Sequence, residues 1–219
     1  MNSSVKAPNV ECTIKQLEIL HPHEDLFDFG RIDRSYWLEK TLTDSEIEVC
    51  LSWCSSSSSG CPSGLSFDYL KKACKRKAEI KSSIAAFYKK VLAGTLVFPA
   101  KLLASRLIAL LKLNGKVRPI AVGQSFARLF SALVFRRLKA QSALFLVPHQ
   151  FGISFVDGTA VCAKFAEIFL TQDFHNVLCV FDFSNAFNTV LRKSILLSLL
   201  ELKLYEFIPV FHALLLIPR

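Results

Sequence analysis

The sequence predicts an α+β fold that is mainly helical, and three observations lead to this class. Several stretches of the 219-residue chain repeat apolar residues at the spacing of a helix. Two apolar runs flank Asn114-Gly115, which is the pattern of a β-hairpin. A third apolar run, at 176–183, has the length of a buried strand. The order of helices, hairpin, two helices, strand and helix is typical of α+β domains.

The helical part begins after a poorly defined N-terminal segment, residues 1–40, in which no period is clear. Residues 41–110 are predicted to form a helical extension. Its first helix starts at Thr43 or Asp44, either of which can cap it. A stretch rich in serine, glycine and proline then predicts a loop over residues 55–64.

A dense basic patch is predicted on the first helix after that loop. Five cations gather there: Lys71, Lys72, Lys75, Arg76 and Lys77. Such a patch is either a solvated helix face or a surface that contacts phosphates, and the sequence leaves both open. One or two helices continue from here until Gly94 and Pro99 end them.

The hairpin is predicted around Asn114-Gly115, because this pair supplies the two positive φ angles of a type I′ turn. Pro119 lacks a backbone donor, so the second strand is predicted to be an edge strand. Cations near the tip serve either solubility or ligand binding. They are Lys112, Lys116 and Arg118.

Three helices and the single strand follow the hairpin. Residues 124–146 form an amphipathic helix, with Arg128 off its core face, and residues 159–173 form another. Ser184 or Asn185 can cap the last helix. The side chains expected to face the core on the first of these helices are Phe126, Leu129, Phe130, Leu133 and Val134.

Charge and hydrophobicity indicate which partners and which cellular compartment to expect. The formal net charge is +9, which favours a polyanionic partner such as nucleic acid over a merely soluble basic domain. Hydrophobic residues make up 52%, yet lysines and glutamates interrupt each long apolar stretch, so no membrane span and no membrane partner are predicted. The N-terminus lacks the apolar run of a signal peptide. We expect an intracellular, soluble protein of the cytoplasm or nucleus.

Seven cysteines without a paired framework suit a reducing compartment. Four of them lie close enough together in the sequence to suggest a zinc site, although the spacing between them favours free thiols. They are Cys50, Cys54, Cys61 and Cys74.

Asp182 is the residue whose position most suggests chemistry. It lies at the carboxyl end of the predicted strand, just before a helix N-terminus whose free amides can bind phosphate. Mg²⁺ takes one or two carboxylates together with substrate phosphates and water. A nucleotidyl-transfer site is therefore one interpretation, and a turn residue at a strand end is the other.

Three motifs in this order resemble the reverse transcriptase domain of non-LTR (LINE-type) retrotransposons. They read "NGKVRPIAVG", "HQFGISFVDGTA" and "FDFSNAFNTV". The resemblance covers about residues 40–219 and implies that residues 111–219 form the fingers and the incomplete start of a right-hand polymerase palm. The loop that precedes the fingers usually ends in Pro-Asp-Gly in this family; here Pro62-Ser63-Gly64 stands in its place.

The resemblance implies that Asp182 is the first catalytic aspartate of an RNA-directed DNA polymerase, a ligand to both Mg²⁺ ions. The main-chain carbonyl of Phe183 would be a further metal ligand. The amides of Asn185 and Ala186 would hold the triphosphate. Phe187 matches an aromatic gate beneath the ribose; the alternative for this residue is core packing at the helix start.

Further roles implied by the resemblance fall on two earlier motifs. Arg118 matches an arginine of the fingers that closes over the triphosphate, and Lys112 matches a lysine on the same hairpin. Gln150 and Gly152 match a motif on the template side. The implied partners are an RNA template, a DNA primer and deoxynucleoside triphosphates.

The family also requires two adjacent aspartates on a later palm hairpin and a thumb. The chain contains no Asp-Asp pair, and the acids after Asp182 are Glu201 and Glu206 on a predicted helix. We therefore expect a fragment of a polymerase that is inactive alone. A non-catalytic nucleic-acid-binding remnant or domesticated protein is the alternative, and a decayed product without function is a third.

Overall fold

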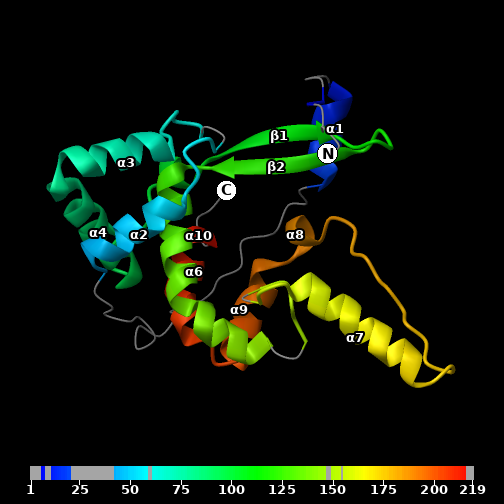
Figure 1. Cartoon of the computed structure of the whole chain (residues 1–219). Coiled ribbons are helices and arrows are strands. Elements are labelled where there is room, and N and C mark those ends of the chain that lie inside the picture. The colour runs from blue at the N-terminus through cyan, green and yellow to red at the C-terminus, as the bar shows by residue number, and fades with distance from the viewer. Residues whose placement is uncertain are drawn as a thin grey trace. The chain divides into compact units, whose positions relative to one another are not determined.

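The computed structural model describes residues 6–7, 11–20, 42–58, 61–146, 149–153 and 155–215. It is an α+β structure of ten helices and one two-stranded antiparallel sheet within these residues (Figure 1). The elements are α1 (Glu11–Leu20), α2 (Asp44–Trp53), α3 (Phe67–Arg76), α4 (Ala78–Leu92), α5 (Ala100–Leu103), β1 (Ser105–Leu111), β2 (Val117–Gly123), α6 (Ser125–Leu146), α7 (Gly158–Gln172), α8 (Ala186–Thr189), α9 (Arg192–Glu201), a 3₁₀ turn η2 (Tyr205–Phe207) and α10 (Ile208–Leu215).

The chain divides into two compact units. The larger unit contains residues 1–134 and 187–219, and the smaller contains residues 135–186. Helix α6 passes from one unit into the other. No helix in the described ranges is long and apolar enough to cross a membrane.

Helix α2 begins as the sequence predicts, with Thr43 as its cap. The Thr43 side chain accepts a hydrogen bond from the Glu46 N–H at 3.3 Å, and the Glu46 carboxylate accepts one from the Thr43 N–H at 3.0 Å. This reciprocal pair is a capping box, which satisfies two amides that the helix start leaves without partners.

The stretch predicted as one or two helices forms two, α3 and α4. They are divided at Lys77, where φ is −136°. Helix α4 ends at Leu92, and Gly94 follows its C-cap as the predicted breaker. The Gly94 N–H donates to the Val91 carbonyl and the Thr95 N–H to the Lys90 carbonyl, which is a Schellman motif. Gly94 has φ +66°, a conformation that glycine adopts without steric cost.

An aromatic cluster forms the centre of the larger unit. Tyr88 from α4 is fully buried and packs against Phe98, Phe126 and Phe130, with ring centroids 4.9 to 6.3 Å apart. Its hydroxyl donates to the Phe126 carbonyl at 2.7 Å, so the buried polar atom has a partner. Burial raises the pKa of Tyr88. The cluster joins α4 and the first turns of α6 into one core.

The hairpin of β1 and β2 forms where predicted, in the register Leu111↔Val117 to Ser105↔Gly123. The predicted type I′ turn is wrong, because Gly115 has φ +75° while Asn114 keeps a negative φ. The Gly115 N–H donates to the Lys112 carbonyl at 3.0 Å and the Lys112 N–H to the Lys116 carbonyl at 2.8 Å. This is a three-residue loop, a type I turn followed by a glycine bulge.

Lys6 and Ala7 form an isolated antiparallel bridge with the outer edge of β1. Lys6 forms a bridge with Leu110, and the Ala7 N–H donates to the Ala109 carbonyl at 2.8 Å. Because Ala109 turns its carbonyl away from β2, its partner Pro119 lies at a position where no ladder donor is needed. Within the described residues β2 pairs only with β1, as the proline predicts.

Helix α6 buries the predicted apolar face, including Leu129, Phe130 and Leu133. Arg128 does not lie off the core as predicted. Its guanidinium lies over the ring of Phe67 at 5.0 Å, a cation–π contact between α6 and the start of α3. A long cationic side chain can cover apolar surface with its stem, which the helical pattern alone does not show.

In the smaller unit, α7 forms as predicted but the buried strand over 176–183 does not. Residues 177–183 have no strand partner within the described part of the chain, and their side chains are exposed, with Val180 at 85% and Phe181 at 83%. The apolar run predicts burial, but a strand also needs a neighbour to pair with, and none is present there. The prediction of a palm sheet beginning at this segment therefore has no support in the described structure.

The last predicted helix is also broken into two, α8 and α9. Thr189 and Val190, both β-branched and weak helix formers, lie at the break. Asn185 has φ 57°, which is not the extended conformation of a capping residue. Beyond it, Leu196 of α9 packs with Ile208 and Phe211 of α10 in a small buried cluster.

Candidate functional site

The exposed end of the hairpin presents the first group of predicted site residues. Lys112 and Lys116 flank the turn, and Arg118 pairs with Leu110 across the ladder. All three side chains are exposed. None forms an ion pair with a carboxylate in the described part of the chain, so their charge is available to an external anion.

Asp182 and Phe183 lie in the extended, irregular segment between α7 and α8, and both are exposed. Phe183 is 79% exposed. Among the described residues no three histidine, cysteine, aspartate or glutamate side chains come together as metal ligands. An exposed carboxylate outside any such group does not fit the two-Mg²⁺ centre that the resemblance implies, because one carboxylate cannot replace the hydration of two ions.

Asn185, Ala186 and Phe187 form the turn into α8. Helix α8 has only four residues, so its amides make a much smaller dipole than a full helix start. Phe187 is 99% exposed, and its alternative assignment to core packing is wrong. Its predicted place beneath a ribose stays a prediction.

Gln150 and Gly152 form a local turn in the smaller unit. The Gly152 N–H donates to the Gln150 side-chain carbonyl at 2.6 Å, and both residues are exposed. The glutamine oxygen is therefore used within the turn. Contact of these residues with a template stays a prediction.

The predicted site residues are distributed over both units. Lys112, Arg118 and Phe187 belong to the larger unit, whereas Asp182 and Gln150 belong to the smaller. The expectation that hairpin cations and Asp182 meet at one nucleotide stays a prediction.

The basic patch on α3 is partly consumed by contacts within the protein. Lys71 donates to the Cys54 carbonyl at 2.6 Å, which closes the end of α2, and Lys72 pairs with Asp68 at 2.7 Å. The remaining cations of the patch, Lys75, Arg76 and Lys77, are exposed. Fewer charges are thus left for phosphates here than the sequence indicates.

The loop that precedes α3 forms a polar network which sequence reasoning missed. The Ser63 hydroxyl donates to the Gln124 side chain at 2.7 Å, and the Ser125 hydroxyl donates to the Leu65 carbonyl. Both partners of the loop lie at the start of α6. Ser63 therefore ties this loop to the residue that follows β2.

Cys61 belongs to the same network. Its thiol donates to the Leu65 carbonyl at 3.0 Å and lies 3.2 Å from the Ser63 hydroxyl. Burial raises the pKa of Cys61, but hydrogen bonds from Ser63 and Ser125 outweigh it and lower the pKa to about 7. All the cysteines are free thiols, and those named as zinc ligands form no metal cluster among the described residues.

Comparison of the chain with known protein families, curated proteins and solved structures finds no match.

Proposed function

We propose that this chain is the fingers-containing part of an RNA-directed DNA polymerase of the non-LTR retrotransposon type, and that it binds nucleic acid without polymerising by itself. The proposal rests on the three ordered motifs in the sequence and on the cationic hairpin. The hairpin carries the argument. It presents Lys112, Lys116 and Arg118 on an exposed two-stranded arm.

The physical reason is the cost of leaving such charges clustered. Like charges a few residues apart repel one another, and here no described carboxylate offsets them. Phosphate groups remove this repulsion and release counterions when they bind. A sugar–phosphate backbone is the ligand class that suits an extended cationic arm best.

Salt-dependent binding tests the proposal. We expect the purified chain to bind a recessed DNA primer annealed to an RNA template, with an affinity that falls steeply as salt rises. A variant with Lys112→Ala, Lys116→Ala and Arg118→Ala should lose most of this affinity. Lys89→Ala, Lys90→Ala and Lys101→Ala remove the same charge from exposed positions elsewhere and serve as the matched control. Equal losses in both variants would refute the role of the hairpin.

The second candidate function is that of a non-catalytic nucleic-acid-binding remnant or domesticated protein, with which an exposed Asp182 outside any metal-ligand cluster of the described residues is also compatible. Extension of the primer in the presence of Mg²⁺ and deoxynucleoside triphosphates distinguishes catalysis from binding alone. We expect binding without extension. Extension that disappears in Asp182→Asn would show that this carboxylate completes a catalytic centre despite its exposure.

A further inference from the structure

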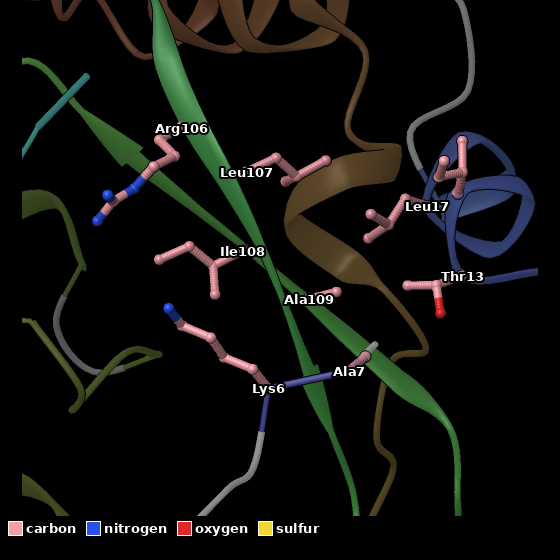
Figure 2. A pocket seen from close by; sticks show the side chains of 9 residues that line it. Lys6, Ala7, Thr13, Leu17, Arg106, Leu107, Ile108 and Ala109 are labelled. Carbon is pink, nitrogen blue, oxygen red and sulfur yellow. The ribbon is translucent and has the colours of Figure 1, made fainter. Parts of the chain in front are cut away.

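Lys6 and Ala7, together with α1 and β1, line a pocket of about 310 Å³ that the sequence did not indicate. Figure 2 shows Lys6, Arg106 and Ile108 on one side of β1, and Leu107 and Ala109 on the other, toward α1. The pocket lies along the outer edge of the strand. Two of its nine lining residues are cations and none is an acid.

The pairing of the strands explains why the cations share one face. Residues opposite each other in a ladder project to the same side, and the side alternates along each strand. Lys6 pairs with Leu110, which pairs with Arg118. Arg106 lies four residues before Leu110 and so projects to that side as well. Helix α1 lies toward the opposite face, where Leu107 and Ala109 point (Figure 2).

The backbone adds a donor at the same edge. Because the Ala109 carbonyl accepts from Ala7 at the outer edge, the alternation turns the N–H of Leu107 to that edge too. Lys6 and Arg106 thus project from one face along the strand edge that the pocket follows.

Neither cation is neutralised within the described part of the chain. Lys6 and Arg106 are both exposed, and neither takes part in an ion pair. Lys6 is about 5 Å from Leu110 and Arg118 about 5 Å beyond it, whereas Arg106 lies about 13 Å along the strand. Cations at such separations match the spread of several phosphates along a chain rather than one small anion.

We propose that Lys6 and Arg106 form a phosphate-binding site that extends the cationic hairpin face to its base, and that its occupant is the backbone of single-stranded nucleic acid. The inference rests on the proposed function and deepens it. The bridge with Leu110 and the hydrogen bond from the Ala7 N–H position Lys6 at this surface.

Binding of an oligouridine measured over a range of salt concentrations tests this site. Each phosphate contact on a single strand contributes about 0.7 to the slope of log K against log salt, so Lys6→Ala with Arg106→Ala should lower the slope by about 1.4. Lys89→Ala with Lys90→Ala, the same charge loss on α4, should leave the slope unchanged. Both residues of the test pair are exposed, so the fold should persist.

Ala7→Pro gives an independent readout. It removes the N–H that donates to the Ala109 carbonyl and holds Lys6 at the edge of β1, but it keeps both cations. It should weaken binding and leave Arg106 in place. A test pair that behaves like the α4 control, while the hairpin variant still loses affinity, would overturn the site and leave nucleic-acid binding intact. No salt-dependent binding by the unaltered chain would overturn both.

Discussion

At the scale of single residues, the loop network around Cys61 shows how neighbouring hydroxyl groups change the chemistry of a buried thiol. The Ser63 hydroxyl reaches Gln124 at 2.7 Å and also lies beside the Cys61 thiol. Together with Ser125 it lowers the pKa of Cys61 to about 7, although burial acts in the opposite direction. The folded protein therefore favours the thiolate more than the unfolded chain does.

This shift predicts a pH-dependent contribution to stability. A depressed pKa stabilises the fold above the unfolded pKa, and the gain is lost as pH falls through the folded pKa. The difference in unfolding free energy between the natural chain and Cys61→Ala should therefore grow by about 2 kcal/mol from about pH 6 to about pH 10. Urea titrations at the two pH values measure it. A difference that does not change with pH would show that the thiolate is not favoured.

A second prediction at the residue scale concerns Gly158, where a side chain would collide with the backbone. A Cβ atom built there would lie 1.8 Å from the Phe151 carbonyl oxygen, a backbone atom that cannot move aside alone. Gly158→Ala should therefore disrupt the turn before α7 and speed proteolysis of residues 149–158. Gly123→Ala is the matched control, because its Cβ would meet nothing closer than 3.6 Å. Equal protease resistance of both variants would contradict the close approach.

At the scale of elements, the helices and the hairpin could be predicted from the sequence because local rules determine them. The Thr43 capping box, Gly94 at the end of α4 and Asn114-Gly115 in the hairpin are all short-range signals. The predicted turn type was wrong because the Asn114 side chain accepts a hydrogen bond from the Lys116 N–H at 3.1 Å and Asn114 keeps a negative φ. Sequence rules identified the turn but not its geometry.

Elements that depend on distant partners could not be predicted. The apolar run 176–183 has the composition of a buried strand, but the described chain offers it no ladder neighbour. Helix α1 and the bridge at Lys6 show the opposite result, because they form although the sequence did not predict them. Their sequences have no clear period, and contacts with the hairpin stabilise them.

The unpaired segment predicts self-association. Residues 177–181 are apolar, uncharged and free of proline and glycine, a composition that promotes pairing between copies. Val180→Lys with Phe181→Lys should lower light scattering at a given protein concentration, and unfolding free energy should hardly change because both side chains are exposed. Leu113→Lys with Leu144→Lys adds the same charge at other exposed positions, 92% and 81% exposed. A similar reduction in scattering by this control would assign the effect to net charge alone.

At the scale of the whole molecule, the candidate site is predicted less well than the fold. The hairpin cations are exposed as a ligand-binding role requires, and Asp182 is exposed too, but it belongs to no group of three potential metal ligands in the described residues. The spacing of motifs along a sequence indicates which residues have a role in a family. It does not supply the neighbouring strands and acids that make a metal centre, which must come from other segments.

In the proposed function, the hairpin contacts nucleic acid from its tip to the residues at its base. Photo-cross-linking tests it directly, with a primer–template that carries a photoreactive uridine at successive template positions. We expect the labelled peptides to come from residues 105–123 and from the peptide that contains Lys6. The cross-linking yield should fall as the salt concentration rises. Labels confined to residues 158–187, with none on the hairpin, would contradict the account.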